Sequence, residues 1–117
     1  MDLNHAIQAH VEWRIKFRSA ISKQEQMDFA AIAADNCCPL GKWLHGEGKS
    51  ELGKLKAYSV CVQKHAAFHV EAGKVAQAIN SKKYAEAEAM LDVETAYQAA
   101  SLAVGIAINA LKKEAGL

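Results

Sequence analysis

The sequence predicts an all-α protein, an antiparallel four-helix bundle with an additional short helix. The 117 residues include 7 glycines and one proline, and 51% of them are apolar, with alanine supplying much of that share. This composition favours helices that pack closely. Apolar residues also recur at helical spacing along three long segments, separated by short breaks. A chain of this length suits one domain, residues 1–117, with one core.

The first helix is expected over about residues 2–22. His10 falls on its apolar stripe, which consists of Leu3, Ile7, Trp13, Phe17 and Ile21. Those positions recur at the spacing of one helix face. A weaker segment over about residues 26–34 predicts a short helix, and Asp35-Asn36 predicts a break after it.

Pro39 predicts the first position of a further short helix, because its missing N–H has no partner in a first turn anyway. That helix would carry Leu40, Trp43 and Leu44 and end near residues 46–48.

Two long helices complete the prediction. Ser50 is a plausible N-cap for a third helix over about residues 50–79. Asn80-Ser81 breaks the chain, and a fourth helix is expected over about residues 82–113.

Charge and termini argue against several classes of partner. The formal net charge is +1, so bulk charge does not favour nucleic acid or an anionic membrane as a partner. The N-terminus carries no pattern of a secretion signal. The longest apolar stretch, residues 96–111, is interrupted by polar residues and is too short to span a bilayer comfortably. Three cysteines, two of them neighbours, make a disulfide scaffold unfavourable, so a reducing cytoplasm is the expected location.

His65 and His69 are the first candidate metal ligands. They are four residues apart on a predicted helix, so both imidazoles project from one face and can share an ion. The same face carries Val62 and Ala72 and therefore points toward the core. Buried neutral imidazoles need polar partners, and a metal ion serves both. Histidines at this spacing are also common as ordinary surface or hydrogen-bonded residues.

Cys38 and His10 extend the candidate site. If Pro39 is the first helical residue, Cys38 is the N-cap, where backbone amides favour a thiolate, the form that binds zinc. Cys37 is expected to point elsewhere, and both Cys37 and Cys61 can be small packed residues. His10 brings the set to three histidines and one cysteine, which is a zinc type of ligand set.

Three motifs together resemble the chemoreceptor zinc-binding (CZB) domain family. They are His10-x-x-Trp13, Cys38-x-Leu40-Gly41-Lys42-Trp43 and His65-x-x-x-His69. The resemblance implies a helical-bundle domain that binds one Zn²⁺ through His10, Cys38, His65 and His69. It also implies a homodimer within bacterial signalling proteins, either chemotaxis receptors or diguanylate cyclases.

Four protein ligands would leave no open position on the zinc ion, so the chain is not expected to be an enzyme. The expected function is a sensory or regulatory domain that responds to zinc, or to oxidation of its zinc-bound cysteine by an oxidant such as hypochlorous acid. An output domain in the same chain, or a partner protein, would receive the signal. The alternative is a structural, zinc-clamped protein-interaction module. Gly41 is expected to permit a close approach, and Asp35 is a candidate acceptor for a ligand histidine.

Overall fold

The computed structural model describes all 117 residues and contains only helices as regular secondary structure. The helices are α1 (Leu3–Val11), α2 (Trp13–Lys23), α3 (Phe29–Ala33), α4 (Pro39–His45), α5 (Glu47–Leu52), α6 (Lys56–Asn80), α7 (Tyr84–Met90) and α8 (Ala96–Ala115). The prediction of an all-α fold is therefore confirmed.

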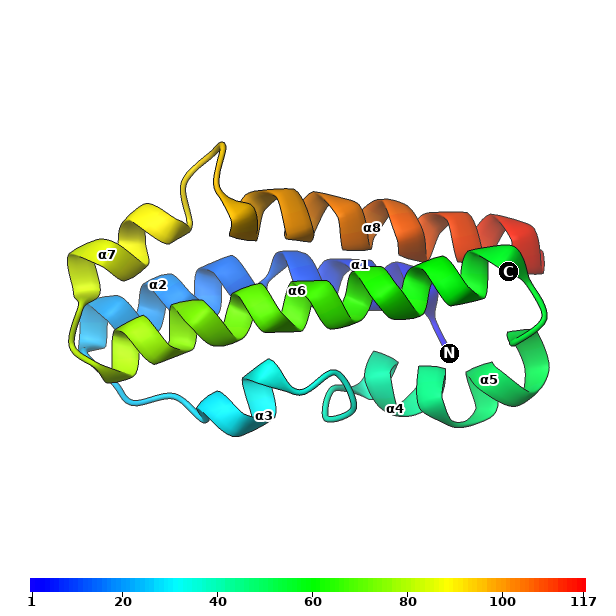
Figure 1. Cartoon of the computed structure of the whole chain (residues 1–117), viewed down its shortest axis with the longest axis horizontal. Coiled ribbons are helices and arrows are strands. Elements are labelled where there is room, and N and C mark those ends of the chain that lie inside the picture. Colours follow the sequence, from blue (N-terminus) through cyan, green and yellow to red (C-terminus); the bar gives the residue numbers. More distant parts are fainter.

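Helix α6 runs along the length of the molecule, and the other elements are arranged around it (Figure 1). Its most extensive contacts are with α8 and then with α3, while α1 also packs against α8. Figure 1 shows α3, α4 and α5 following one another along the side of α6 away from α8. The molecule is elongated, with principal extents of 43 × 25 × 19 Å.

The expected first helix is present as α1 and α2, which meet at Glu12. The Glu12 backbone stays in the right-handed helical region, with φ −69° and ψ −14°. The hydrogen bond from Lys16 N to Glu12 O, at 3.2 Å, begins the second helix directly at the junction. The chain therefore continues in nearly the same direction, and the apolar stripe is preserved.

The prediction that Ser50 caps a helix over residues 50–79 is wrong. Ser50 lies inside α5, and α6 begins at Lys56 after the N-cap Leu55, which has no side-chain cap. The free N–H of Lys56 instead donates to Glu114 Oε1 in α8, at 3.1 Å. The helix start is thus fixed by a residue distant in sequence, which local patterns cannot reveal.

The prediction of one continuous helix over residues 82–113 is also wrong. The chain forms α7, leaves helical geometry near Glu94, where φ is +62°, and begins α8 after Thr95. Thr95 Oγ1 accepts a hydrogen bond from Gln98 N at 3.1 Å, which satisfies a free amide of the first turn. The Thr95-x-x-Gln98 spacing is a capping signal, and here it marks the true start of the last helix.

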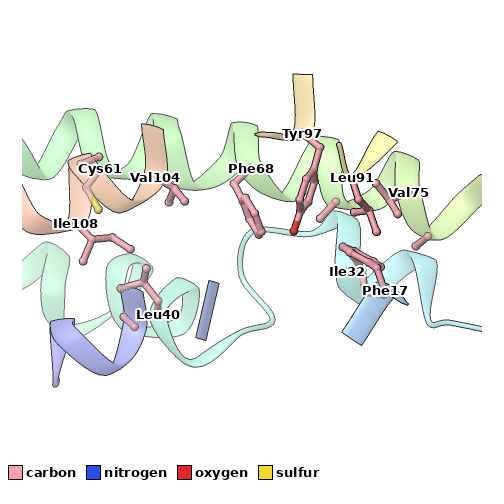
Figure 2. Packing of buried hydrophobic residues seen from close by; sticks show 14 of the residues in the cluster. Phe17, Ile32, Leu40, Cys61, Phe68, Val75, Leu91, Tyr97, Val104 and Ile108 are labelled. Carbon is pink, nitrogen blue, oxygen red and sulfur yellow. The ribbon is translucent and has the colours of Figure 1, made fainter. Parts of the chain in front are cut away.

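The core lies between α6, α8 and the α1–α2 pair and reaches down to α3 and α4 (Figure 2). Phe17, Phe68 and Tyr97 form its aromatic part, and the Phe68 and Tyr97 ring centroids are 5.7 Å apart. Cys61 is fully buried among these apolar side chains, as expected for a small packed residue. None of the helices combines the length and hydropathy needed to cross a membrane.

Candidate metal centre

Three segments far apart in sequence bring four side chains together. His10 comes from α1, Cys38 from the residue preceding α4, and His65 and His69 from the middle of α6. One donor atom from each lies within 4.8 Å of all the others. The Cys38 Sγ atom is 3.2 Å from His65 Nε2, 3.6 Å from His69 Nε2 and 3.9 Å from His10 Nε2.

Backbone carbonyls fix the orientation of two of the imidazoles. His10 Nδ1 donates to Ala6 O at 2.7 Å, and His69 Nδ1 donates to Ile32 O at 2.8 Å. A carbonyl oxygen can only accept, so each Nδ1 carries the proton and each Nε2 keeps its lone pair. Both lone pairs therefore face the space occupied by the Cys38 sulfur. Metal-ligating histidines usually have their ring orientation fixed by a hydrogen bond of this kind.

His65 differs from the other two histidines because its Nδ1 atom is buried and has no hydrogen-bond partner. Its Nε2 atom is 3.0 Å from His69 Nε2, which already carries a lone pair. Two imidazole nitrogens this close must share either a proton or a cation. A cation at this point would satisfy the converging Nε2 lone pairs, whereas His65 Nδ1, which does not face the cluster donors, would still lack a partner.

Burial keeps the three imidazoles neutral. Desolvation lowers the pKa of His65 to about 3, and the neighbouring His69 and His10 act in the same direction. Desolvation likewise lowers the pKa of His10 and of His69, although their carbonyl hydrogen bonds partly oppose it. The Phe68 ring adds to this dry environment, with its centroid 5.2 Å from that of His10 and 5.4 Å from that of His69. Neutral imidazole is the form that binds a metal.

Cys38 is the N-cap of α4, as predicted, and its sulfur accepts a hydrogen bond from Gly41 N at 3.3 Å. The expected influence of the cap is present, because the hydrogen bond from Gly41 lowers the pKa of Cys38. Burial is the larger effect and raises the pKa of Cys38, with the Gly41 hydrogen bond opposing it only in part. Ionisation of Cys38 at neutral pH therefore requires a cation among the imidazoles.

The loop before α4 depends on Gly41. A Cβ atom at this position would lie 1.8 Å from the Asp35 carbonyl oxygen, so only glycine permits this approach. The prediction that Gly41 allows a close contact is confirmed. Asp35, in contrast, does not orient a candidate ligand, because its Oδ2 atom pairs with His45 Nε2 at 3.0 Å on the surface.

The donor set suits zinc. Ligand distances of about 2.0–2.1 Å to nitrogen and about 2.3 Å to sulfur place neighbouring donors of a tetrahedral site roughly 3.3–3.7 Å apart. The pairs measured here span 3.0 Å between His65 and His69 to 3.9 Å between Cys38 and His10. No two of the four donors are more than 4.8 Å apart, so movements of about 1–1.5 Å at the widest pair would close the set around a zinc ion, and the residues present fit it.

The other cysteines and histidines of the chain do not belong to this cluster. Cys37 is exposed, Cys61 is buried in the core, and both His5 and His45 are exposed. Sequence reasoning missed the backbone acceptors. The Ala6 carbonyl is one helical turn before His10 and could have been anticipated. The Ile32 carbonyl reaches His69 only because α3 packs closely on α6. Ala33 of α3 lies against Gly73 of α6, where an added Cβ atom would be 2.7 Å from the Ala33 Cβ.

A family model described as the chemoreceptor zinc-binding domain matches residues 10–76, which is more than half of the chain. The matched region contains all four clustered side chains, from His10 in α1 to His69 in α6. No curated protein and no solved structure is significantly similar to the chain.

Proposed function

The chain belongs to the chemoreceptor zinc-binding domain family, and on this basis we propose that it is a zinc-binding sensory domain of bacterial signalling. The proposed ligands are Nε2 of His10, His65 and His69 together with Sγ of Cys38. The convergence of these four donors within 4.8 Å carries the proposal. The two carbonyl-bound Nδ1 atoms support it, because they leave lone pairs directed at one point.

A regulatory role is favoured over catalysis. Hydrolytic zinc sites keep one position for water, whereas three imidazoles and one thiolate would complete a tetrahedral set. When bound, zinc would hold Cys38 as a thiolate while leaving its sulfur nucleophilic. This combination suits a site that changes state rather than one that turns over a substrate.

We infer that oxidation of Cys38 is one signal and that loss of zinc is its consequence. Hypochlorous acid converts a thiolate into a sulfenic acid and chloride, so the sulfur loses two electrons and gains a hydroxyl group. The sulfenic acid no longer offers an anionic ligand, and zinc affinity falls. Zinc concentration itself is the other candidate signal. A structural clamp, the rival function, would keep its zinc until the protein unfolds.

The partners are part of the same proposal. We propose an antiparallel four-helix bundle, made of α1–α2, the α3–α5 segment, α6 and α7–α8, that acts as a homodimer in the cytoplasm. Successive segments reverse direction along the molecule in Figure 1, which supports the bundle. An output domain, such as that of a chemotaxis receptor or a diguanylate cyclase, would receive the signal in cis or from a partner chain.

The test begins with metal content. Protein prepared without added metal is expected to contain about one zinc per chain, and His65→Ala and His69→Ala are each expected to lose most of it. His45→Ala is the matched control, because His45 is exposed and pairs only with Asp35. Iron in place of zinc, or full zinc in both His65→Ala and His69→Ala, would overturn the ligand assignment.

Oxidant titration then separates a sensor from a clamp. Hypochlorous acid is added while a chromogenic chelator reports free zinc and circular dichroism reports helix content. A sensor releases zinc in the wild type and in Cys37→Ser while remaining folded, and it recovers zinc after reduction. In Cys38→Ser zinc is already weakly held, because a neutral hydroxyl is a poor ligand. Oxidation confined to Cys37 or Cys61 with zinc retained would favour the clamp.

A further inference from the structure

A cavity of about 260 Å³ opens beside the candidate metal centre. Its walls include Cys38 and His10 but not His65 or His69, which are almost completely buried behind them. The opposite side of the cluster is closed by Phe68 and by the α3 backbone at Ile32. A molecule from solution therefore meets the cluster at the Cys38 sulfur, through this cavity.

The lining of this cavity carries positive charge and no negative charge. Its ionisable members besides the two cluster residues are Lys16, His5 and the N-terminal amine of Met1, and no carboxylate contributes to it. The rest is mainly apolar, with Ala6, Ala9 and Pro39 among the lining residues. A small anion would find a favourable potential there and would not encounter a like charge.

Lys16 is held near the cavity by Trp13. Its Nζ atom lies 4.7 Å from the centroid of the Trp13 ring, a cation–π contact that limits where the ammonium group can move. Lys16 and Trp13 also line a neighbouring open groove of about 630 Å³ against α3. Lys16 therefore lies at the boundary between the groove and the cavity.

We propose that this cavity is the entrance to Cys38 and that Lys16 makes it selective for small anions over neutral molecules of the same size. The proposal deepens the proposed sensory function, on which it rests, by naming the chemical class of reagent that reaches the sulfur. Of the two forms of the oxidant, it is the hypochlorite anion, not neutral hypochlorous acid, that the cavity would favour. Lys16 acts here as a specificity-determining residue and does not coordinate the metal.

The test compares two alkylating reagents of nearly equal size, iodoacetate and iodoacetamide. With either reagent the Cys38 sulfur attacks the methylene carbon, a sulfur–carbon bond forms and iodide leaves. The zinc-loaded protein carries Cys37→Ser, so that modification at Cys38 can be followed by mass spectrometry without a neighbouring thiol. The quantity measured is the ratio of the iodoacetate rate to the iodoacetamide rate.

Lys16→Gln is expected to lower this ratio about two- to fivefold, and raising the salt concentration to about 1 M is expected to have the same effect on the parent protein. Lys83→Gln, which removes an exposed lysine far from the cavity, is the control and should leave the ratio unchanged. An unchanged ratio in Lys16→Gln would overturn the selectivity proposal.

Ala9→Leu tests the route itself. The larger side chain narrows the cavity, and both reagents are expected to slow at least fivefold in a variant whose helix content matches the parent. Unaltered rates in that variant would mean that reagents reach Cys38 elsewhere. These readouts do not depend on signalling. If oxidants fail to release zinc, the proposed sensory function is refuted. The alkylation ratio would still test, independently, how reagents reach Cys38.

Discussion

At the scale of single residues, Cys38 has two roles that are set by one backbone conformation. Its extended backbone, with φ −78° and ψ 160°, starts α4, and the same geometry directs its sulfur toward three imidazoles. The position is maintained by Gly41, which donates to the sulfur and, having no side chain, leaves room for the Asp35 carbonyl to approach closely. A change at Gly41 should therefore affect stability and metal binding together.

Gly41→Ala is expected to destabilise the protein by about 1–3 kcal/mol, because the added methyl would overlap the Asp35 carbonyl and force the loop to move. Zinc affinity is expected to fall as well, since the same loop positions Cys38. Urea unfolding and competition with a zinc chelator measure the two effects.

Gly105→Ala is the matched control. No atom lies within 4 Å of the place its Cβ would occupy in the middle of α8, so alanine should raise stability by about 0.5–1 kcal/mol. Equal effects of the two substitutions would contradict the role given to Gly41.

The clustering of the four side chains could be anticipated from the sequence because the signals are local. A four-residue spacing predicts that His65 and His69 share a face, and a proline predicts that Cys38 is a cap. The ionisation of Cys38 could not be predicted, because it depends on how deeply three packed segments bury the sulfur. That burial raises the pKa of Cys38 despite the cap.

At the scale of elements, Asn80 ties the end of α6 to the connection between α2 and α3. Its Oδ1 atom accepts from Met27 N at 2.7 Å, and its Nδ2 atom donates to Met27 O at 2.9 Å. One side chain thus satisfies both backbone groups of a loop residue. Because α3 carries the Ile32 carbonyl that orients His69, this link also supports the metal centre.

Asn80→Ala is expected to lower the free energy of unfolding by about 1–3 kcal/mol, because Met27 N loses its partner and Met27 O keeps only the hydrogen bond from Phe29 N. Asn109→Ala, at an exposed position of α8, should change it by no more than about 0.5 kcal/mol. Thermal or urea unfolding of the two variants gives the comparison. A similar small effect at both positions would show that the Asn80 link contributes little.

The elements themselves were predictable where apolar periodicity or a cap was present in the sequence. The helix starting at Pro39 and the break after Asn80 were placed correctly. The break before Thr95 was missed because apolar and alanine residues continue on both sides of it. The start of α6 was missed because Glu114 supplies the partner of Lys56 across the fold.

At the scale of the whole molecule, four large apolar side chains of α1, α2 and α8 are exposed, namely Val11, Ile15, Leu102 and Ile106. Helix α1 packs against α8, and α2 is linked to α8 by the Arg14–Gln98 hydrogen bond. These side chains on neighbouring helices define one candidate surface. Tyr97 and Ala107 of α8 are buried within the chain and are not available for a contact between chains.

We predict that this surface mediates the homodimer. Ile106, 71% exposed, is its most accessible side chain, and Ile106→Glu is expected to convert the dimer into a monomer because the charge would be buried between the two chains. Val93→Glu is the control, since Val93 is 70% exposed outside this surface. Light scattering at micromolar concentration reports the mass. A monomeric wild type would refute the prediction.

His65 and His69 lie near the middle of α6, so a rearrangement at the metal centre would tilt the helix about its middle and move both of its ends. About 14 Å of helix extends from His65 to the start at Lys56, and roughly 17 Å from His69 to the end at Asn80. A tilt of about 10° around the metal centre would therefore move the two ends of α6 by roughly 2–3 Å. At one end the movement would strain the hydrogen bond between Lys56 and Glu114, and at the other it would pull on Met27. A small change among four ligands would in this way reach both ends of the molecule.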